Sequence, residues 1–308
     1  MEVRGLVGAD IEISIDEVKT FFRRINPRKA SGPDGISSRT LTMCADELAQ
    51  PFQRLFQLSL DTVWTPAYGK NHEQPKECND LRPVALTSTV RKCFENIILN
   101  QLLSEVPHLL DPSQFAYRAK RGVEDALLTS INNVSEHLEH ARSLVKIVFI
   151  DFSSAFNTIQ PHLMVRKLLH LGVNPGLTLW IHDFLTDRSQ QVRLNSHISS
   201  LKSINTGAPQ GCVLSPILYT LYTNDCQASS SAHHYFKYAD DTALVGFLHS
   251  DISSLEGFER EVQGFIKWCT DNFLMVNVKK TKEMLTDFSK KAITVSQSKM
   301  NGSIQNEW

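Results

Sequence analysis

The amino-acid sequence predicts an α+β fold. Apolar residues at helical spacing dominate the chain, and the few strand-like segments do not alternate regularly with helices, as they would in a parallel α/β sheet. The composition is that of an ordinary globular protein, with 42% hydrophobic and 21% charged residues, which excludes disorder, a collagen-like repeat or a coiled coil for the whole chain. Its 308 residues correspond to one large domain or to two or three tightly joined subdomains, since a domain has roughly 100–200 residues.

Net charge and hydropathy exclude two further classes of protein, those that are strongly basic and those that span a membrane. The formal net charge is −1, which is not that of a strongly basic nucleic-acid-binding protein but leaves room for local basic strips. The longest apolar stretch, Leu144–Ile150, contains Lys146. It is far shorter than the about 20 apolar residues of a membrane-spanning helix, so no membrane segment is predicted.

The termini and the cysteines indicate an intracellular protein. The N-terminus has no apolar run behind a basic start, so no secretory signal is predicted. The six cysteines are scattered, without a CxxC pair and without a metal-ligand spacing to the histidines. We interpret them as reduced thiols.

The first part of the chain predicts helices around a basic loop. Ser14 and Glu17 fit a capping box, and apolar residues at helical spacing follow until an Asn-Pro pair ends the helix. A basic, turn-rich loop covers Arg28–Gly35, and a second helix is predicted over Leu41–Phe56. Residues 65–83 hold three prolines and little periodicity, so no element is predicted there.

The middle of the chain predicts helices and one buried strand. Helical spacing covers Val90–Leu102 and Val123–Leu138, and the short β-branched run Leu144–Ile150 predicts a buried strand that ends at Asp151. A helix over 161–172 begins at a proline and ends at a glycine, which is the usual asymmetry.

The remainder predicts a second set of helices and strands. Helices are predicted over Leu177–Leu185, over Leu214–Tyr222 and, long and amphipathic, over Leu255–Cys269. A short strand is predicted over Gln191–Asn195. The other strands come in two predicted hairpins, listed here with their turns: Tyr235–Phe247 around Ala239–Asp241, and Leu274–Phe288 around Lys279–Lys282.

Acidic residues follow or connect the predicted strands. Asp151 ends the buried strand, and Asp240 and Asp241 lie at the tip of a hairpin. If these strands are neighbours, three carboxylates meet at one end of a sheet. Carboxylate oxygens are ligands that Mg²⁺ takes, and two such ions about 4 Å apart can stabilise an in-line phosphoryl displacement. Each site by itself also fits a structural role, because Asp caps strands and forms turns.

Several segments, taken in order, resemble the sequence motifs of reverse transcriptases. They match the non-LTR (LINE-type) retrotransposon enzymes better than retroviral, telomerase or intron-encoded ones. Those that resemble motifs A to D are Phe149-Ile-Asp151-Phe-Ser-Ser-Ala-Phe156, Thr206-Gly-Ala-Pro-Gln210-Gly211-Cys-Val-Leu-Ser-Pro216, Tyr238-Ala-Asp240-Asp241 and Trp268-Cys-Thr-Asp-Asn-Phe-Leu-Met-Val-Asn277-Val-Lys-Lys280. Upstream, Arg28–Ile36, Leu81–Ser88 and Gln114–Arg118 resemble segments of the fingers.

The resemblance implies a right-hand polymerase with fingers and palm, in which helices flank an antiparallel palm sheet. We expect an N-terminal segment and fingers over residues 1–146, and a palm over 147–290 with a finger insertion at about 166–205. Residues 291–308 are expected to be a truncated tail that leads toward a missing primer grip and thumb. The finger strand ahead of Arg82 resembles a partly deleted version, at residues 64–80, of the strand in the family.

The resemblance also implies a function, namely RNA-directed DNA polymerisation. Such an enzyme adds dNTPs to a DNA primer on an RNA template, uses two Mg²⁺ ions and works in the nucleus and cytoplasm without a membrane. The shortened finger segment and the early end of the chain leave two alternatives open. One is a catalytically silent retroelement remnant, and the other is an RNA-binding module that retains the fold.

The resemblance assigns the reacting centre to motifs A and C. Asp151 and Asp240 would hold both Mg²⁺ ions, and Asp241 would support the ion at the primer end. The backbone carbonyl of Phe152 would help to bind the metal of the incoming triphosphate. Phe156 would lie under the sugar and exclude a 2′-hydroxyl group, a role compatible with packing in the core.

Other residues would contact the nucleotide. Gln210 and Gly211 would line the dNTP and template pocket, and Arg82 would pair with the triphosphate, because a guanidinium fork suits phosphate oxygens. Lys280 would approach the leaving pyrophosphate as a cation or proton donor, or would be a solvated lysine of the hairpin.

Nucleic-acid contacts are expected mostly at the backbone, since a polymerase accepts any sequence. Two basic strips are candidates for such contacts and equally for plain solvated surface. They comprise Arg23, Arg24, Arg28 and Lys29, and Lys279, Lys280 and Lys282.

Overall fold

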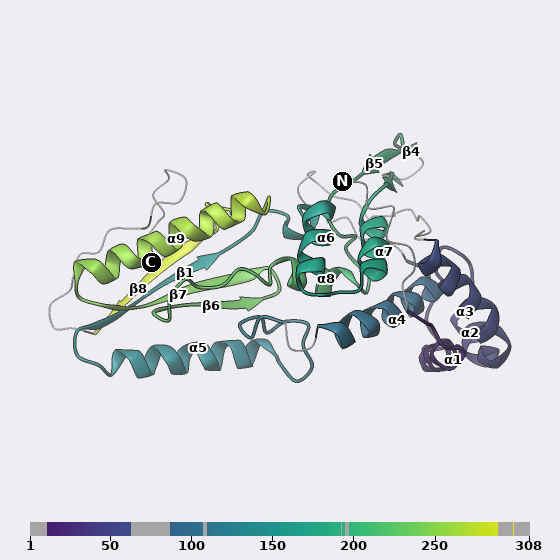
Figure 1. The fold of residues 1–308 in the computed structure, drawn as a ribbon, viewed down its shortest axis with the longest axis horizontal. Helices are drawn as coiled ribbons and strands as arrows, with labels where there is room; N and C mark the ends of the chain where they lie inside the picture. Colours follow the sequence, from purple (N-terminus) through teal and green to yellow (C-terminus); the bar gives the residue numbers. More distant parts are fainter. Residues whose placement is uncertain are drawn as a thin grey trace. The chain divides into compact units, whose positions relative to one another are not determined.

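The computed structural model consists of two compact units (Figure 1). The first is drawn from residues 1–109 and 159–221 and the second from 110–158 and 222–308. The residues that the structure describes are 11–62, 87–106, 110–191, 193–194, 197–288 and 298. Helices together with an antiparallel sheet confirm the predicted α+β class, whereas the predicted boundaries between fingers and palm stay a prediction.

The first unit is mainly helical. Its helices are α1 (Ile15–Arg24), α2 (Ser38–Met43), α3 (Ala45–Asp61), α4 (Thr89–Glu105), α6 (Pro161–His170), α7 (Pro175–Leu185) and α8 (Ser215–Tyr222), of which Tyr222 belongs to the second unit. Two strand pairs, β2 (Arg188–Gln190) with β5 (Lys202–Ile204) and β3 (Arg193–Leu194) with β4 (His197–Ile198), occupy the region of the predicted short strand. The capping box at Ser14 and Glu17 is confirmed. The single helix predicted over Leu41–Phe56 is wrong, because the chain leaves helical geometry at Cys44 and starts a new helix there.

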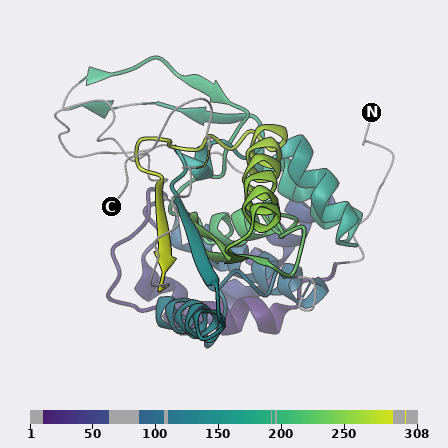
Figure 2. The same ribbon diagram turned by 90° about the vertical axis from the view of Figure 1, so that its left-hand side faces the viewer.

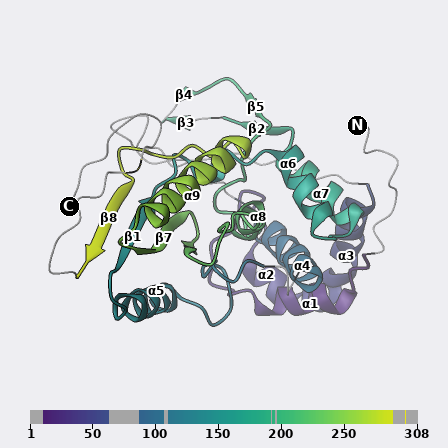
Figure 3. The same ribbon diagram turned by 60° about the vertical axis from the view of Figure 1, so that its left-hand side comes forward.

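Aromatic side chains hold the helices of the first unit together, and Phe94 of α4 contacts one ring from α3 and one from α7, the helix that lies next to α4 in Figure 3. The rings of Phe56 and Phe94 stack with centroids 4.5 Å apart, and Trp180 meets Phe94 edge-on at 5.3 Å. The indole Nε1 of Trp180 donates a hydrogen bond to Ser59 Oγ at 3.1 Å. The polar atom of the largest buried ring is thus satisfied, as burial requires.

The second unit is a four-stranded antiparallel sheet with two long helices (Figure 2). The strand order is β6-β7-β1-β8. The elements are α5 (Val123–Leu138), β1 (Ser143–Ile150), the 3₁₀ helix η2 (Ala155–Asn157), β6 (His233–Tyr238), β7 (Asp241–His249), α9 (Ile252–Asp271) and β8 (Lys282–Asp287). The buried strand before Asp151 and the hairpin around Ala239 are therefore confirmed.

Helices α5 and α9 cover opposite faces of this sheet (Figure 1). Successive residues of a strand point to opposite faces. Accordingly, Val145 and Ile147 pack against side chains of α5, whereas Lys146 lies under α9 with its Nζ 5.6 Å from the ring centroid of Phe258. The ammonium group of Lys146 pairs with Glu283 of β8 at 2.7 Å, and both side chains are largely buried.

The hairpin predicted over Leu274–Phe288 is wrong. Only its second half is a strand, β8, and the residues before it pair with the segment that follows β1. Ser153 N donates to Met275 O at 2.8 Å, and Asn277 N donates to Asp151 O at 2.7 Å. An alternating pattern predicts an extended chain but does not identify its partner. Among the described residues, no helix is long and apolar enough to cross a membrane.

Candidate catalytic site

The strand register brings the acidic residues to one end of the sheet. The final pair between β1 and β7 is Ile150 with Thr242, so Asp151 and Asp241 flank the same ladder end. The β6–β7 hairpin closes with the pair Tyr238 and Asp241, which leaves Ala239 and Asp240 as a two-residue turn. The juxtaposition expected from the sequence is therefore present in the backbone pairing.

Electrostatics shows that the carboxylates influence one another. Burial raises the pKa of Asp241, and the negative charges of Asp240 and Asp151 raise it further. The Nζ of Lys280 lies 3.9 Å from Asp151 Oδ2, with side chains that are 71% and 35% exposed. Such an exposed pair contributes little stability by itself.

The donor set fits Mg²⁺ chemically, because three carboxylates present oxygen ligands and a divalent cation would offset the charges of Asp240 and Asp151 that raise the pKa of Asp241. Within the described part of the chain, however, no group of three or more His, Cys, Asp or Glu side chains is arranged to hold a metal ion.

A buried glutamine fixes the acidic turn. Ala239 adopts a φ of 58°, in the left-handed region that disfavours residues with a Cβ. The side chain of Gln114 accepts hydrogen bonds from Ala239 N and Ala116 N, each at 3.1 Å, and donates to Ala239 O at 3.2 Å. Its amide thus mimics a neighbouring strand and satisfies both peptide groups of Ala239.

The segment that carries this glutamine is fastened to β6. Phe115 N donates to Lys237 O at 2.8 Å, and Lys237 N donates to Ser113 O at 2.9 Å. The buried ammonium group of Lys237 pairs with Asp111 at 2.5 Å and donates to the carbonyl oxygens of Thr223 and Cys226. A charge-assisted network of this kind holds its members in one arrangement.

The segment after β1 is held equally closely. Ser153 N donates a hydrogen bond to Met275 O, and Asp151 O accepts one from Asn277 N. Phe152 lies between these two bonds and forms an isolated β-bridge with Val276. Both bonds are made by the neighbours of Phe152 and not by its own peptide groups. Phe156 is half-buried in η2, five positions after Asp151 in the same unit.

The loop that carries Gln210 and Gly211 belongs to the first unit and is clamped at both ends. Arg188 donates to the carbonyl oxygens of Thr206 and Gly207 at its start. At its end, the buried carboxylate of Glu95 accepts from Val213 N at 2.6 Å and from Leu214 N at 3.4 Å.

Arg91 pairs with Glu95 at 3.1 Å and so compensates the buried charge of that carboxylate. The carboxylate itself meets the backbone at the start of α8, where anions are favoured. The sequence carried no signal for the clamp, because Glu95 and Val213 are 118 positions apart.

The residues predicted to contact the nucleotide are not shown to lie near the carboxylates. Arg82 lies outside the described residues. Gln210 and Gly211 lie in the first unit, whereas Asp151, Asp240 and Asp241 lie in the second. Their part in a common site stays a prediction.

Comparison with known proteins identifies the family. The family described as reverse transcriptase (RNA-dependent DNA polymerase) matches residues 70–302. The chain belongs to the reverse transcriptase family. The segment that resembles motif A follows β1, the one that resembles motif C lies at the β6–β7 turn, and the one that resembles motif B precedes α8.

The relatives of this reverse transcriptase domain come from non-LTR, LINE-type elements. The chain is 27% identical over 286 residues to the RNA-directed DNA polymerase from mobile element jockey of Drosophila melanogaster, covering 87% of this chain and 31% of the relative. It is 26% identical over 227 residues to the Pol polyprotein of the type-1 retrotransposable element R2 of Popillia japonica, covering 70% and 30%. The chain thus spans about a third of the length of these relatives.

A solved structure of apo telomerase from Candida tropicalis, truncated from its C-terminal domain, shares 15% identity with this chain. Its TM-score is 0.43, and the match covers 64% of this chain and 40% of that one.

Proposed function

We propose that this chain carries out RNA-directed DNA polymerisation, adding dNTPs to a DNA primer on an RNA template. The observation that carries the proposal is the register of β1, β6 and β7, which brings Asp151, Asp240 and Asp241 to one end of a sheet. Membership of the family and the similarity to the RNA-directed DNA polymerase from mobile element jockey support it.

In this proposal Asp151 and Asp240 hold two Mg²⁺ ions, and Asp241 supports the ion on the primer side. When bound, the ions stabilise charge on the attacking and leaving oxygens. The backbone carbonyl of Phe152 would help to bind the metal of the incoming triphosphate. The two flanking backbone hydrogen bonds support this, because they are made by Ser153 and Asp151 and leave the Phe152 carbonyl out. Lys280, whose ammonium group already lies near Asp151, neutralises or protonates the leaving pyrophosphate.

The nucleotide contacts follow from the same proposal. Phe156 lies under the sugar and excludes a 2′-hydroxyl group, which is supported by its position just after the segment that carries Asp151. Gln210 and Gly211 line the nucleotide pocket, and their clamped loop supplies the rigidity that positioning requires. Arg82 pairs with the triphosphate.

The deciding experiment is primer extension with purified protein and Mg²⁺, on an RNA template and on a DNA template of the same sequence. Asp240→Asn removes one carboxylate charge with little change of shape. We expect it to lower extension on the order of 100-fold or more, because it weakens the binding of the ions that stabilise charge on the reacting oxygens. Glu256→Gln is the matched control, since it removes an exposed carboxylate charge from α9 in the same unit.

Two outcomes would contradict the proposal. If Asp240→Asn extends primers as well as the parent chain, this end of the sheet is not the reacting centre. If a folded parent chain binds RNA but extends no primer, the RNA-binding alternative holds instead.

A further inference from the structure

A buried charge, the carboxylate of Glu95, lies in the middle of α4. The side chain of Glu95 is 1% exposed, and that of Arg91, its ion-pair partner one turn earlier, is 14% exposed. Apolar side chains of similar volume in place of a buried ion pair are often neutral or stabilising for a protein. Stability alone therefore does not explain a carboxylate at this position, and its other contacts supply the explanation.

Apart from Arg91, the donors to this carboxylate in the described part of the chain come from one short segment before α8. Val213 N donates to Glu95 Oε2 at 2.6 Å, and Leu214 N donates to the same oxygen at 3.4 Å. The thiol of Cys212 is hydrogen-bonded to the same carboxylate. Burial and the charge of Glu95 raise the pKa of this thiol to about 12, so it keeps its proton near neutral pH and is the donor. Three consecutive residues are thus attached to one side chain of α4.

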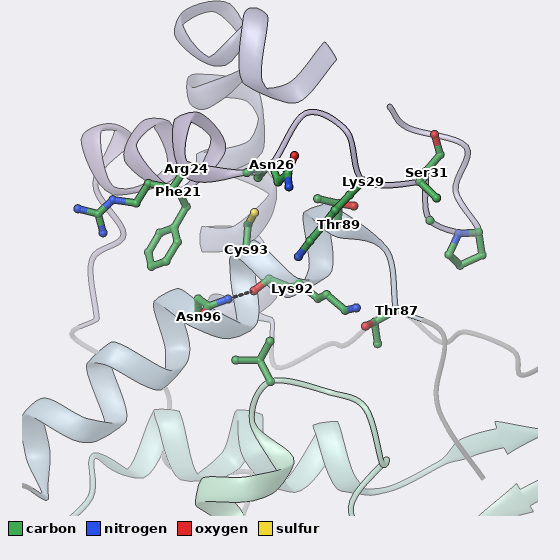
Figure 4. Close-up of a pocket in the computed structure, with 15 residues that line it drawn as sticks. Phe21, Arg24, Asn26, Lys29, Ser31, Thr87, Thr89, Lys92, Cys93 and Asn96 are labelled. Carbon is green, nitrogen blue, oxygen red and sulfur yellow. Dashed lines mark hydrogen bonds between the residues drawn. The ribbon is translucent and has the colours of Figure 1, made fainter. Parts of the chain in front are cut away.

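The position of Val213 shows independently that this segment lies against α4. Val213 lines a pocket of about 820 Å³ together with Cys93 and Asn96 of α4 (Figure 4). Glu95 lies between those two residues in the sequence but is not among the described residues that line the pocket. Its carboxylate is therefore directed at the backbone of the loop and not at this pocket.

The anchored residues directly follow the pair Gln210 and Gly211. Gly211 is exposed and has a φ of 90°, whereas Cys212 is buried, so the chain turns at the surface and enters the protein at the next residue. On the other side of the pair, Gly207 N donates to Ile159 O at 2.7 Å. The pair is thus held between two fixed points, both of which belong to the first unit.

An anchor of this kind affects the binding of a ligand to the loop. A loop without anchors loses backbone conformational entropy when it orders around a ligand, and this loss weakens binding. A loop that is already ordered avoids the loss. Because hydrogen bonds to a charged acceptor are stronger than neutral ones, the Glu95 carboxylate orders the loop better than an uncharged side chain would.

We propose that Glu95 is a positioning residue for nucleotide binding, which holds residues 212–214 so that Gln210 and Gly211 keep the arrangement that receives the incoming dNTP. The inference rests on the proposed function, since it takes Gln210 and Gly211 as part of the dNTP pocket. Glu95 acts through the loop and does not touch the nucleotide.

The test is steady-state primer extension with dTTP on poly(rA) primed by oligo(dT). Glu95→Gln keeps the shape of the side chain but removes its charge. We expect the KM for dTTP to rise about 10-fold while kcat changes less than about 2-fold, the pattern of an interaction that contributes equally to ground-state and transition-state binding. Glu47→Gln removes an exposed carboxylate from α3 of the same unit and should leave both constants unchanged.

A second variant separates positioning from the stability of the ion pair. Arg91→Gln breaks the same pair in the same helix, but it leaves the loop donors on Glu95. A purely structural role predicts that both variants lower the melting temperature and change the kinetics alike. We expect instead that Arg91→Gln lowers the melting temperature, because it leaves a buried charge without its partner, yet keeps the KM for dTTP within about 2-fold. Equal increases of KM in the two variants would overturn the proposal.

Nucleotide binding without chemistry separates this proposal from polymerisation. Fluorescence anisotropy measures the affinity of the protein for fluorescein-labelled dUTP on poly(rA) with a dideoxy-terminated oligo(dT) primer, which cannot be extended. Glu95→Gln should bind the nucleotide about 10-fold more weakly than the parent chain. If the parent binds the nucleotide but extends no primer, the proposed polymerisation fails, and this difference in affinity still decides the role of Glu95. Absence of binding by the parent, or equal binding by parent and variant, would overturn the inference.

Discussion

One buried side chain, Gln114, determines whether the acidic turn keeps its shape. Ala239 is held in a left-handed conformation, which costs a residue with a Cβ roughly 1 kcal/mol. Two hydrogen bonds between the Gln114 amide and the peptide groups of Ala239 offset that cost. Gln114 thereby fixes the conformation of the turn that carries Asp240.

We predict that Gln114→Ala lowers the free energy of unfolding by about 1–3 kcal/mol, because it leaves buried backbone groups unpaired. Primer extension should fall through kcat more than through KM, since the turn that carries Asp240 loses its support. Gln114→Glu keeps the acceptor for Ala239 N and should retain more activity than the alanine variant. Denaturant unfolding and steady-state kinetics measure both effects, with Gln263→Ala on the surface of α9 as the control.

The sequence predicted where the acidic residues lie, but it did not predict the side chain that holds their turn in place. Asp151 follows an apolar β-branched run, and Asp240 and Asp241 interrupt a strand pattern, so their placement could be read locally. Gln114 and Ala239 are 125 positions apart, and no periodicity links them. Contacts of this length depend on the final packing, which a local pattern does not encode.

Among the elements, the fit between β7 and α9 depends on a residue without a side chain. Gly246 pairs with Lys146, and a Cβ at this position would lie 2.3 Å and 2.6 Å from ring atoms of Phe258. Phe258 is fully buried, so its ring has little room to move.

We predict that Gly246→Ala lowers the free energy of unfolding by about 1–3 kcal/mol, the usual cost of overpacking a core. Gly264→Ala on α9 is the matched control, because a Cβ there meets nothing within 4 Å. That control should stabilise the protein by about 0.5–1 kcal/mol through higher helix propensity. Equal changes in the two variants, measured by urea unfolding, would show that the ring moves aside at no cost.

The sequence predicted most helices and strands, but it gave one extended segment the wrong pairing partner and missed one helix break. Alternation over residues 274–288 correctly indicated extended chain, yet the first half pairs with the segment after β1. The chain also divides one predicted helix into two at Cys44. The sequence did not predict this break, because neither glycine nor proline marks it. Both errors arise where local propensity is neutral and tertiary packing decides.

The whole molecule contains two compact units, and only the second contains the carboxylates. A ligand that binds the folded state alone stabilises it by mass action, by about 2.7 kcal/mol at 100 times its dissociation constant. Any stabilisation by Mg²⁺ should therefore be confined to the second unit.

We predict that Mg²⁺ slows amide hydrogen exchange in peptides from β1, β6 and β7, and leaves peptides from α3 and α4 unchanged. Asp151→Asn/Asp240→Asn should abolish this protection. Without Mg²⁺, the same variant should exchange more slowly than the parent chain, because it relieves the repulsion that raises the pKa of Asp241. The control is NaCl at matched ionic strength, and protection of both units by Mg²⁺ would contradict a local site.

The ion pair between Lys146 and Glu283 fixes the register of β8 against β1, and with it the position of Lys280 near Asp151. A slip of β8 by one residue would turn Glu283 to the other face of the sheet. The buried ammonium group of Lys146 would then have lost its carboxylate partner, which is strongly unfavourable. The same slip would carry Lys280, three positions before Glu283, about 3.3 Å along β1, the rise of one strand residue. A salt bridge under α9, several residues from the aspartates, thus sets how far the Lys280 ammonium group reaches toward Asp151.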